Sequence, residues 1–145
     1  MNLISWNTTN MCNMRCDHCY RRAGDFADGT TEVTVPPEEL QTDEAKRLID
    51  EIARAGFKIM IFSGGEPMIR PDLCELGAYA RDKGLMPVLG TNGTLATPEL
   101  AKRLKEAGFA AAGVSLDSLD EEKMNNFRKL PQCKARILEG IENMK

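Results

Sequence analysis

The hydrophobic positions of the chain repeat in a unit that pairs a helix with a short strand. Each unit has apolar residues at helical spacing, then a glycine, then a short apolar run. Helices are predicted over 43–55 with Thr42 as N-cap, from 71 or 72 to near 84, and from 97–98 to 108. Gly56, Gly84 and Gly108 supply the left-handed residue that ends each helix.

Four apolar segments are predicted as strands, at residues 3–8, 57–62, 86–89 and 109–116. Strands that alternate with helices of this length imply βαβ crossovers and a parallel sheet covered on both faces. We therefore predict an α/β fold. Residues 133–145 have helical spacing with no strand after them, so we interpret the chain as ending mid-fold. Residues 24–37 are rich in Asp, Gly and Thr and are predicted as a surface loop.

Length and charge restrict the classes of partner. A chain of 145 residues with 42% hydrophobic content is expected to form one domain over residues 1–145. The net charge of -3 gives no attraction to nucleic acid or anionic lipid, because basic residues are scattered among acidic ones. The chain shows neither a basic leader nor a segment of roughly 18 apolar residues, so we expect a cytoplasmic protein without a membrane partner.

Cysteine placement gives the first indication of chemistry. Cys12, Cys16 and Cys19 fall within eight residues, and the total of five cysteines is odd. This pattern favours metal ligation in a reducing compartment over disulfide bonds. Thiolates are soft ligands that suit iron–sulfur clusters or zinc. A [4Fe-4S] cluster held by only three cysteines leaves one iron open to an exchangeable molecule.

Small and polar residues follow the other three predicted strands. They form the segments Ser63-Gly64-Gly65-Glu66-Pro67, Gly90-Thr91-Asn92-Gly93 and Ser115-Leu116-Asp117. Ligands gather at the carboxyl ends of parallel strands, so these segments and the cysteines are expected at one edge of the sheet.

The spacing C-x-x-x-C-x-x-C after the first strand, with an aromatic residue before the last cysteine, resembles the signature of radical S-adenosylmethionine (SAM) enzymes. His18 takes the aromatic position, and the strand-end motifs follow in the family's order over residues 5 to about 130. The resemblance implies a partial parallel (β/α) barrel with about four of six βα units. It also implies that a [4Fe-4S] cluster on Cys12, Cys16 and Cys19 reductively cleaves SAM, giving a 5′-deoxyadenosyl radical that abstracts hydrogen from a substrate.

The same resemblance implies which residues bind SAM, and it assigns no catalytic protein group. In the family the glycine-rich motif contacts the SAM ammonium, a serine the ribose or carboxylate, and an arginine the carboxylate, which suits a guanidinium fork. The implied cofactor-binding residues are His18, Gly64, Gly65, Glu66, Pro67, Thr91, Asn92, Ser115, Asp117 and Arg128.

Two other functions remain open for the cysteines. One is a structural zinc site with His18 as fourth ligand, and the other is an electron-transfer module with Cys74 or Cys133 as fourth thiolate. We predict that both of these cysteines are core or surface residues instead. The cysteine segment most resembles branches that act on tetrapyrrole precursors or ribosomal peptides. The resemblance thus implies such a substrate and a low-potential electron donor, such as flavodoxin or ferredoxin.

Overall fold

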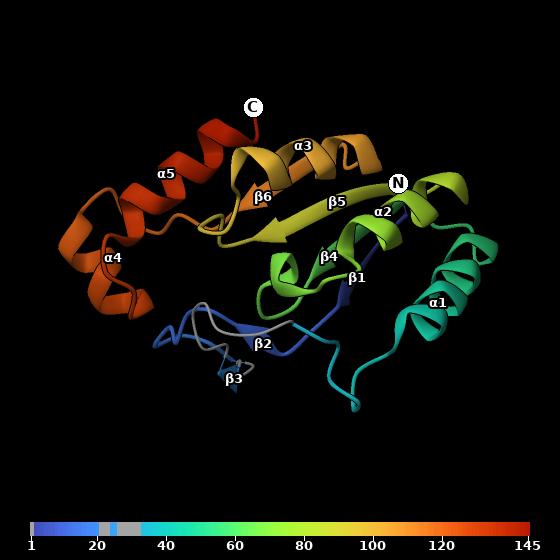
Figure 1. Ribbon diagram of the computed structural model, residues 1–145, viewed down its shortest axis with the longest axis horizontal. Coiled ribbons are helices and arrows are strands. Elements are labelled where there is room, and N and C mark those ends of the chain that lie inside the picture. Colours follow the sequence, from blue (N-terminus) through green and yellow to red (C-terminus); the bar gives the residue numbers. More distant parts are fainter. Residues whose placement is uncertain (1, 21–23, 26–32) are drawn as a thin grey trace.

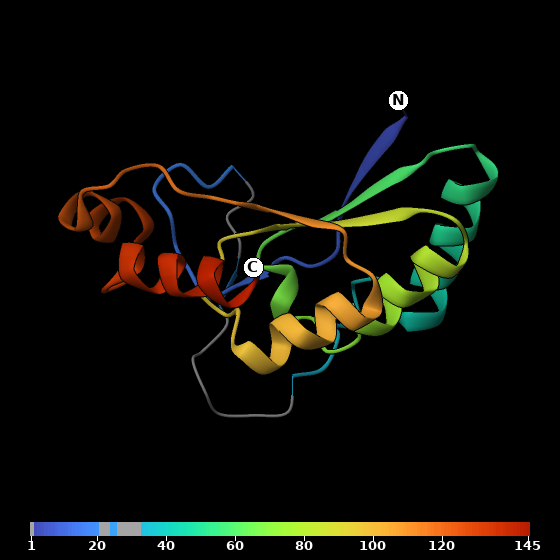
Figure 2. The same ribbon diagram turned by 90° about the horizontal axis from the view of Figure 1, so that it is seen from above.

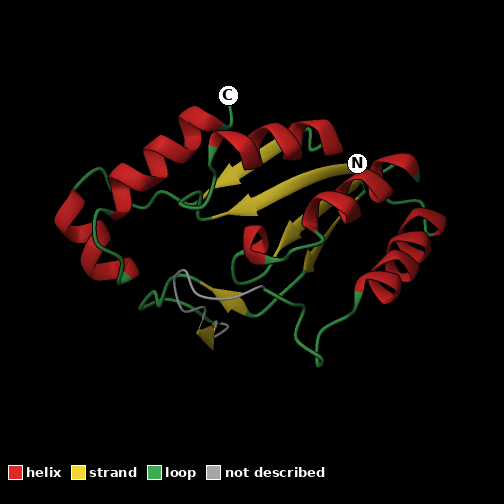
Figure 3. Ribbon diagram, in the orientation of Figure 1, coloured by secondary structure: helices red, strands yellow, loops and turns green. Residues whose placement is uncertain are grey.

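The computed structural model describes residues 2–20, 24–25 and 33–145 and shows an α/β architecture (Figure 3). Its main sheet has the order β1-β4-β5-β6, and every neighbouring pair is parallel. The predicted α/β class and parallel sheet are therefore confirmed. The strands are β1 (Leu3–Asn7), β4 (Ile59–Ser63), β5 (Met86–Thr91) and β6 (Ala111–Val114).

Three helices connect consecutive strands of this sheet (Figure 1). They are α1 (Thr42–Arg54), α2 (Leu73–Asp82) and α3 (Pro98–Ala107), which confirms the predicted helices to within a few residues. Two more helices, α4 (Glu121–Arg128) and α5 (Cys133–Asn143), follow β6. The sequence analysis predicted α5 but neither α4 nor the short helix η1 (Pro67–Ile69).

Helix α1 begins one residue away from the predicted cap. Gln41 is the N-cap, and its backbone amide donates to the Glu44 carboxylate at 2.9 Å as part of a capping box. Thr42 is free to donate its hydroxyl to Asp72 at 2.8 Å instead. The other predicted ends are confirmed: Thr97 caps α3 by accepting from the Leu100 amide at 3.2 Å, and the three predicted glycine stops all have positive φ.

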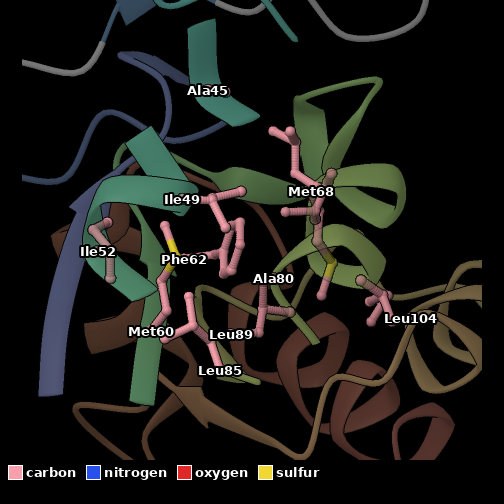
Figure 4. Packing of buried hydrophobic residues seen from close by; sticks show 13 residues of the cluster. Ala45, Ile49, Ile52, Met60, Phe62, Met68, Ala80, Leu85, Leu89 and Leu104 are labelled. Atoms are coloured by element: carbon pink, nitrogen blue, oxygen red, sulfur yellow. The ribbon is translucent and has the colours of Figure 1, made fainter. Parts of the chain in front are cut away.

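The hydrophobic core lies between the sheet and α1, α2 and α3 (Figure 4). Met60, Phe62 and Leu89 alternate along β4 and β5 and are buried against Ile49 and Ala80 of the helices. Alternation with period two places the neighbouring side chains of these strands on the opposite face. The apolar pattern of the strands therefore fixes which face the helices cover.

The prediction that the sheet is covered on both faces is wrong for the described chain. Figure 2 shows α1, α2 and α3 on one side of the sheet, and on the other face Leu3 is 51% and Met86 48% exposed. The strand order never reverses along the chain. Right-handed crossovers that all advance in one direction place every helix on the same side. This is the arrangement of a barrel wall, with the other face turned inward.

A second, two-stranded ladder carries the first of the clustered cysteines. It pairs β2 (Met11–Cys12) with β3 (Gly24–Asp25) in parallel. The second strand lies inside the segment predicted as a surface loop, and residues 26–32 of that segment lie outside the described residues. No helix within the described ranges is long and apolar enough to cross a membrane.

Candidate functional site

A cavity of about 260 Å³ opens at the carboxyl ends of the strands. The three clustered cysteines line it together with residues that end or follow β4, β5 and β6. The structure therefore brings the cysteine loop and the strand-end motifs to one place, as the sequence predicted. The lining residues are Cys12, Met14, Cys16, His18, Cys19, Tyr20, Ser63, Gly64, Gly65, Gly90, Thr91, Asn92, Gly113, Ser115 and Arg128.

The cysteine loop is held by contacts with helix α4. The amide of Asp17 donates to the carbonyl of Phe127 at 2.9 Å, and the amide of Cys19 donates to the carbonyl of Cys16 at 3.0 Å. Met14 is 2% exposed and packs into a small apolar cluster beneath the loop. Backbone hydrogen bonds and a buried anchor thus fix a loop that has little regular secondary structure.

Burial favours the protonated form of two thiols of this loop, Cys12 and Cys16. Desolvation raises the pKa of Cys12 to about 11. Burial also raises the pKa of Cys16, although the positive charge of Arg128 opposes that shift. Thiols ligate metals as thiolates, so cluster or metal binding here releases protons and supplies the positive charge that stabilises the thiolates.

The paired glycines make room for the chain that enters the cysteine loop. Gly64 has φ +137°, and a Cβ there would lie 2.5 Å from the carbonyl oxygen of Thr9. A Cβ on Gly65 would overlap the carbonyl oxygen of Met11. The backbone amide of Gly65 donates to the carbonyl of Thr9 at 2.7 Å. The paired glycines therefore allow a close approach of protein backbone, and both residues also line the cavity.

Glu66 lies behind the cavity wall with a fully buried carboxylate. Its oxygens accept from the Met68 amide at 3.1 Å, the Thr91 hydroxyl at 2.7 Å and the Asn92 amide at 2.8 Å. Burial raises the pKa of Glu66, and these donors counteract the shift. Pro67, the first residue of η1, is likewise buried and does not line the cavity.

Arg128 and Asp117 form an ion pair at the other side of the site. The Arg128 Nε and Nη2 atoms lie 2.7 and 2.6 Å from the same Asp117 oxygen, and the arginine side chain is 6% exposed. Arg128 lines the cavity, whereas Asp117 lies outside it. The ring of His18 stacks on Phe127, with centroids 4.3 Å apart and planes within 5°. His18 also lines the cavity, and Ser115 does so from the end of β6.

Two residues that join the cysteine loop to the segment after β5, Asn13 and Thr94, were not singled out by the sequence analysis. Asn13, within the cysteine loop, accepts a hydrogen bond from the Asn92 side chain at 2.9 Å and donates one to the Thr94 hydroxyl at 2.9 Å. The sequence signal that could have found the bridge was a pair of asparagines, Asn13 between two clustered cysteines and Asn92 in the segment Gly90-Thr91-Asn92-Gly93. Asparagine can donate and accept at once, which suits a bridge between loops.

The arrangement of the thiols fits a cluster better than a single ion. Among the residues that the structure describes, no three His, Cys, Asp or Glu side chains are placed to hold one metal ion. In a [4Fe-4S] cluster each thiolate binds a different iron, so separated thiols around one cavity are suitable ligands. Cys74 packs against the core and Cys133 is buried at the start of α5, and neither lines the cavity.

Comparison with known proteins gives consistent matches. A family model described as the radical SAM superfamily matches residues 6–145. An AdoMet-dependent heme synthase from Methanosarcina barkeri is 46% identical over 140 residues, covering 97% of this chain and 38% of that protein. Mycofactocin maturase MftC from Mycobacterium tuberculosis is 34% identical over 125 residues, covering 86% of this chain and 30% of that protein. The chain thus spans well under half the length of these relatives.

A solved structure supports the fold. The structure of native anSMEcpe with bound AdoMet superimposes with a TM-score of 0.70, covering 99% of this chain and 40% of that one. At 20% sequence identity this likeness concerns the fold alone. It confirms the partial (β/α) barrel that the sequence motifs implied.

Proposed function

Because the chain belongs to the radical SAM superfamily, whose members use a [4Fe-4S] cluster and SAM, we propose that it is the cluster-bearing part of a radical SAM enzyme. The observation that carries the proposal is the placement of three cysteines and the glycine-rich strand ends around one cavity. When bound, the reduced cluster would supply the electron that breaks a carbon–sulfur bond of SAM, giving methionine and a 5′-deoxyadenosyl radical that abstracts hydrogen from a substrate.

Different residues of the site bind the cluster and SAM. Cys12, Cys16 and Cys19 hold the cluster. SAM binds against cavity-lining residues of the strand ends and α4, which are His18, Gly64, Gly65, Thr91, Asn92, Ser115 and Arg128. Glu66 and Asp117 lie outside the cavity and contribute through the lining groups that they bind, Glu66 through Thr91 and Asn92 and Asp117 through Arg128. Pro67 also lies outside the cavity, where it begins η1 directly after Glu66.

A tetrapyrrole precursor is the substrate class that we favour over a ribosomal peptide. The support is the higher identity to a heme synthase, 46% against 34% for a peptide maturase. A low-potential one-electron donor, such as flavodoxin or ferredoxin, would reduce the cluster. We place the protein in the cytoplasm, because a reducing compartment keeps ligand thiols from forming disulfides.

Anaerobic reconstitution with iron and sulfide, followed by electron paramagnetic resonance of the dithionite-reduced chain, tests the proposal. The expected result is a [4Fe-4S]⁺ signal that shifts when SAM is added. Cys16→Ala should lose the signal. The matched control Cys74→Ala should keep it, because Cys74 packs against the core away from the cavity.

Two results would contradict the proposal in different ways. Stoichiometric zinc binding without a cluster would identify a structural metal site. A cluster that requires Cys74 or Cys133, or whose signal ignores SAM, would identify an electron-transfer module. The substrate class is tested with the full-length protein, by measuring 5′-deoxyadenosine release with a tetrapyrrole precursor or with a peptide as substrate.

A further inference from the structure

We propose that Asn13, Asn92 and Thr94 form a positioning bridge that sets the cysteine loop at a fixed distance from the carboxyl end of β5. This inference rests on the proposed function, because the loop would hold the cluster and the strand end would contact SAM. In this role none of the three binds the cluster. They are positioning residues that keep two binding elements aligned.

The bridge is a closed set of hydrogen bonds among three side chains. The Asn92 Nδ2 atom donates to Asn13 Oδ1 at 2.9 Å, and Asn13 Nδ2 donates to Thr94 Oγ1 at 2.9 Å. The Thr94 hydroxyl completes the set by donating to Asn92 Oδ1 at 2.7 Å. Each side chain both donates and accepts, so each member orients the other two.

The orientation of both amides follows from one unambiguous donor. The backbone amide of Thr94 donates to Asn92 Oδ1 at 2.9 Å, and a backbone N–H can only donate. The Nδ2 atom of Asn92 must therefore face Asn13, whose facing atom must be the acceptor Oδ1. This leaves Asn13 Nδ2 to face Thr94. The order of donors and acceptors is thus determined by the fold.

The bridge is anchored beneath the cavity by Glu66. The buried carboxylate accepts from the Asn92 amide at 2.8 Å and from the Thr91 hydroxyl at 2.7 Å, and that hydroxyl accepts from the Gly93 amide at 2.9 Å. Asn92 is itself 7% exposed. The strand-end side of the bridge is therefore rigid, and the more exposed cysteine loop is positioned against it.

Asn13 lies where a small shift would move two thiols. It follows Cys12 directly and precedes Met14. The buried side chain of Met14 fixes the part of the loop that leads to Cys16. Loss of the bridge leaves the entry to the loop attached by backbone hydrogen bonds from Gly65 and Glu66, and its far end by the bond between Asp17 and Phe127. We therefore expect the chain to fold without the bridge, but the loop to move relative to β5.

The test uses Asn13→Ala, Thr94→Val and the double variant of the whole chain. Asn143→Ala is the matched control, because it removes a part-buried hydrogen bond of 2.8 Å to the Ala96 carbonyl, outside the residues that line the cavity. Three readouts are compared after anaerobic reconstitution: the rate of iron release to a chelator, the SAM concentration that half-shifts the cluster signal, and hydrogen exchange of residues 9–20 in the metal-free chain.

Each single variant removes two of the three hydrogen bonds of the bridge. Both should therefore release iron faster and require more SAM to half-shift the cluster signal, by about five- to thirtyfold. The double variant should be little worse than either single one, since the bridge acts as a unit. Exchange over residues 9–20 should rise in the variants and stay unchanged in Asn143→Ala. Wild-type values for Asn13→Ala in all three readouts would overturn the bridge. A wild-type chain without a SAM-sensitive cluster would instead refute the proposed function, while hydrogen exchange still tests the bridge.

Discussion

The amide of Glu66 donates a 2.7 Å hydrogen bond to the carbonyl of Met11. These residues belong to different motifs, and the bond joins the segment after β4 to the chain that enters the cysteine loop. The neighbouring Gly65 amide makes the parallel bond to Thr9 at 2.7 Å. The glycine-rich segment therefore supports the cysteine loop as well as lining the cavity.

Gly65→Ala should displace the cysteine loop. A Cβ at this position overlaps the Met11 carbonyl oxygen, which is backbone and cannot rotate away. We expect most of the reconstituted cluster to be lost, measured as iron and sulfide bound per chain. Gly56→Ala is the control: Gly56 has φ +83° with no atom within 4 Å, so it tests backbone strain alone. Equal loss in both variants would mean that the contact with Met11 is unimportant.

Glu66→Gln should lower the free energy of unfolding by about 1–3 kcal/mol, because the amide NH₂ would face buried N–H and O–H donors. Urea denaturation of the metal-free chain measures the change. Glu106→Gln provides the comparison, since its carboxylate is 64% exposed and 3.9 Å from Lys102. This control should change stability by less than about 0.5 kcal/mol. Equal stability of wild type and Glu66→Gln would show that the buried charge is not needed.

Arg70→Ala should destabilise the chain strongly. The buried guanidinium donates to Asp72 at 2.6 Å, to the Thr8 carbonyl at 2.8 Å and to the Leu40 carbonyl at 2.7 Å. Removing one partner of a buried ion pair costs about 3–5 kcal/mol, because the other charge remains buried. The measurement is again urea denaturation.

Arg54→Ala is the control for Arg70→Ala. It removes an ion pair with Glu51 in which both side chains are more than 60% exposed, at 68% and 65%. Exposed pairs contribute about 0–1 kcal/mol. If Arg70→Ala cost no more than this control, the buried network would not stabilise the end of β1.

Alkylation of Cys12 in the metal-free chain should depend on pH with a midpoint near its raised pKa of about 11. The reacting species is the thiolate, so a raised pKa lowers the rate at neutral pH and moves its increase to more alkaline pH. In urea the midpoint should return toward the ordinary thiol pKa of 9.0. Mass spectrometry of the alkylated peptide measures both curves, and coincident midpoints would contradict the burial of this thiol.

The sequence determined the regular elements of the fold because their signals are local. Short apolar runs, helical spacing and glycine stops identified the four strands of the main sheet and the helices that join them. It did not reveal α4, which is short and mostly polar and whose buried face is recognisable only where it packs beneath the cysteine loop. It also predicted a sheet covered on both faces, because the direction in which strands are added is not a local property.

The sequence also indicated that the cysteine loop and the strand ends gather at one place, since strand ends of a parallel sheet share one edge. Only the tertiary structure decided what those side chains do there. It turned Glu66 inward to bind Asn92, paired Asp117 with Arg128, and joined Asn13 to Asn92 across 79 residues. Such contacts depend on strand register and loop packing, which bring distant residues within hydrogen-bonding distance and leave no periodic pattern in the chain.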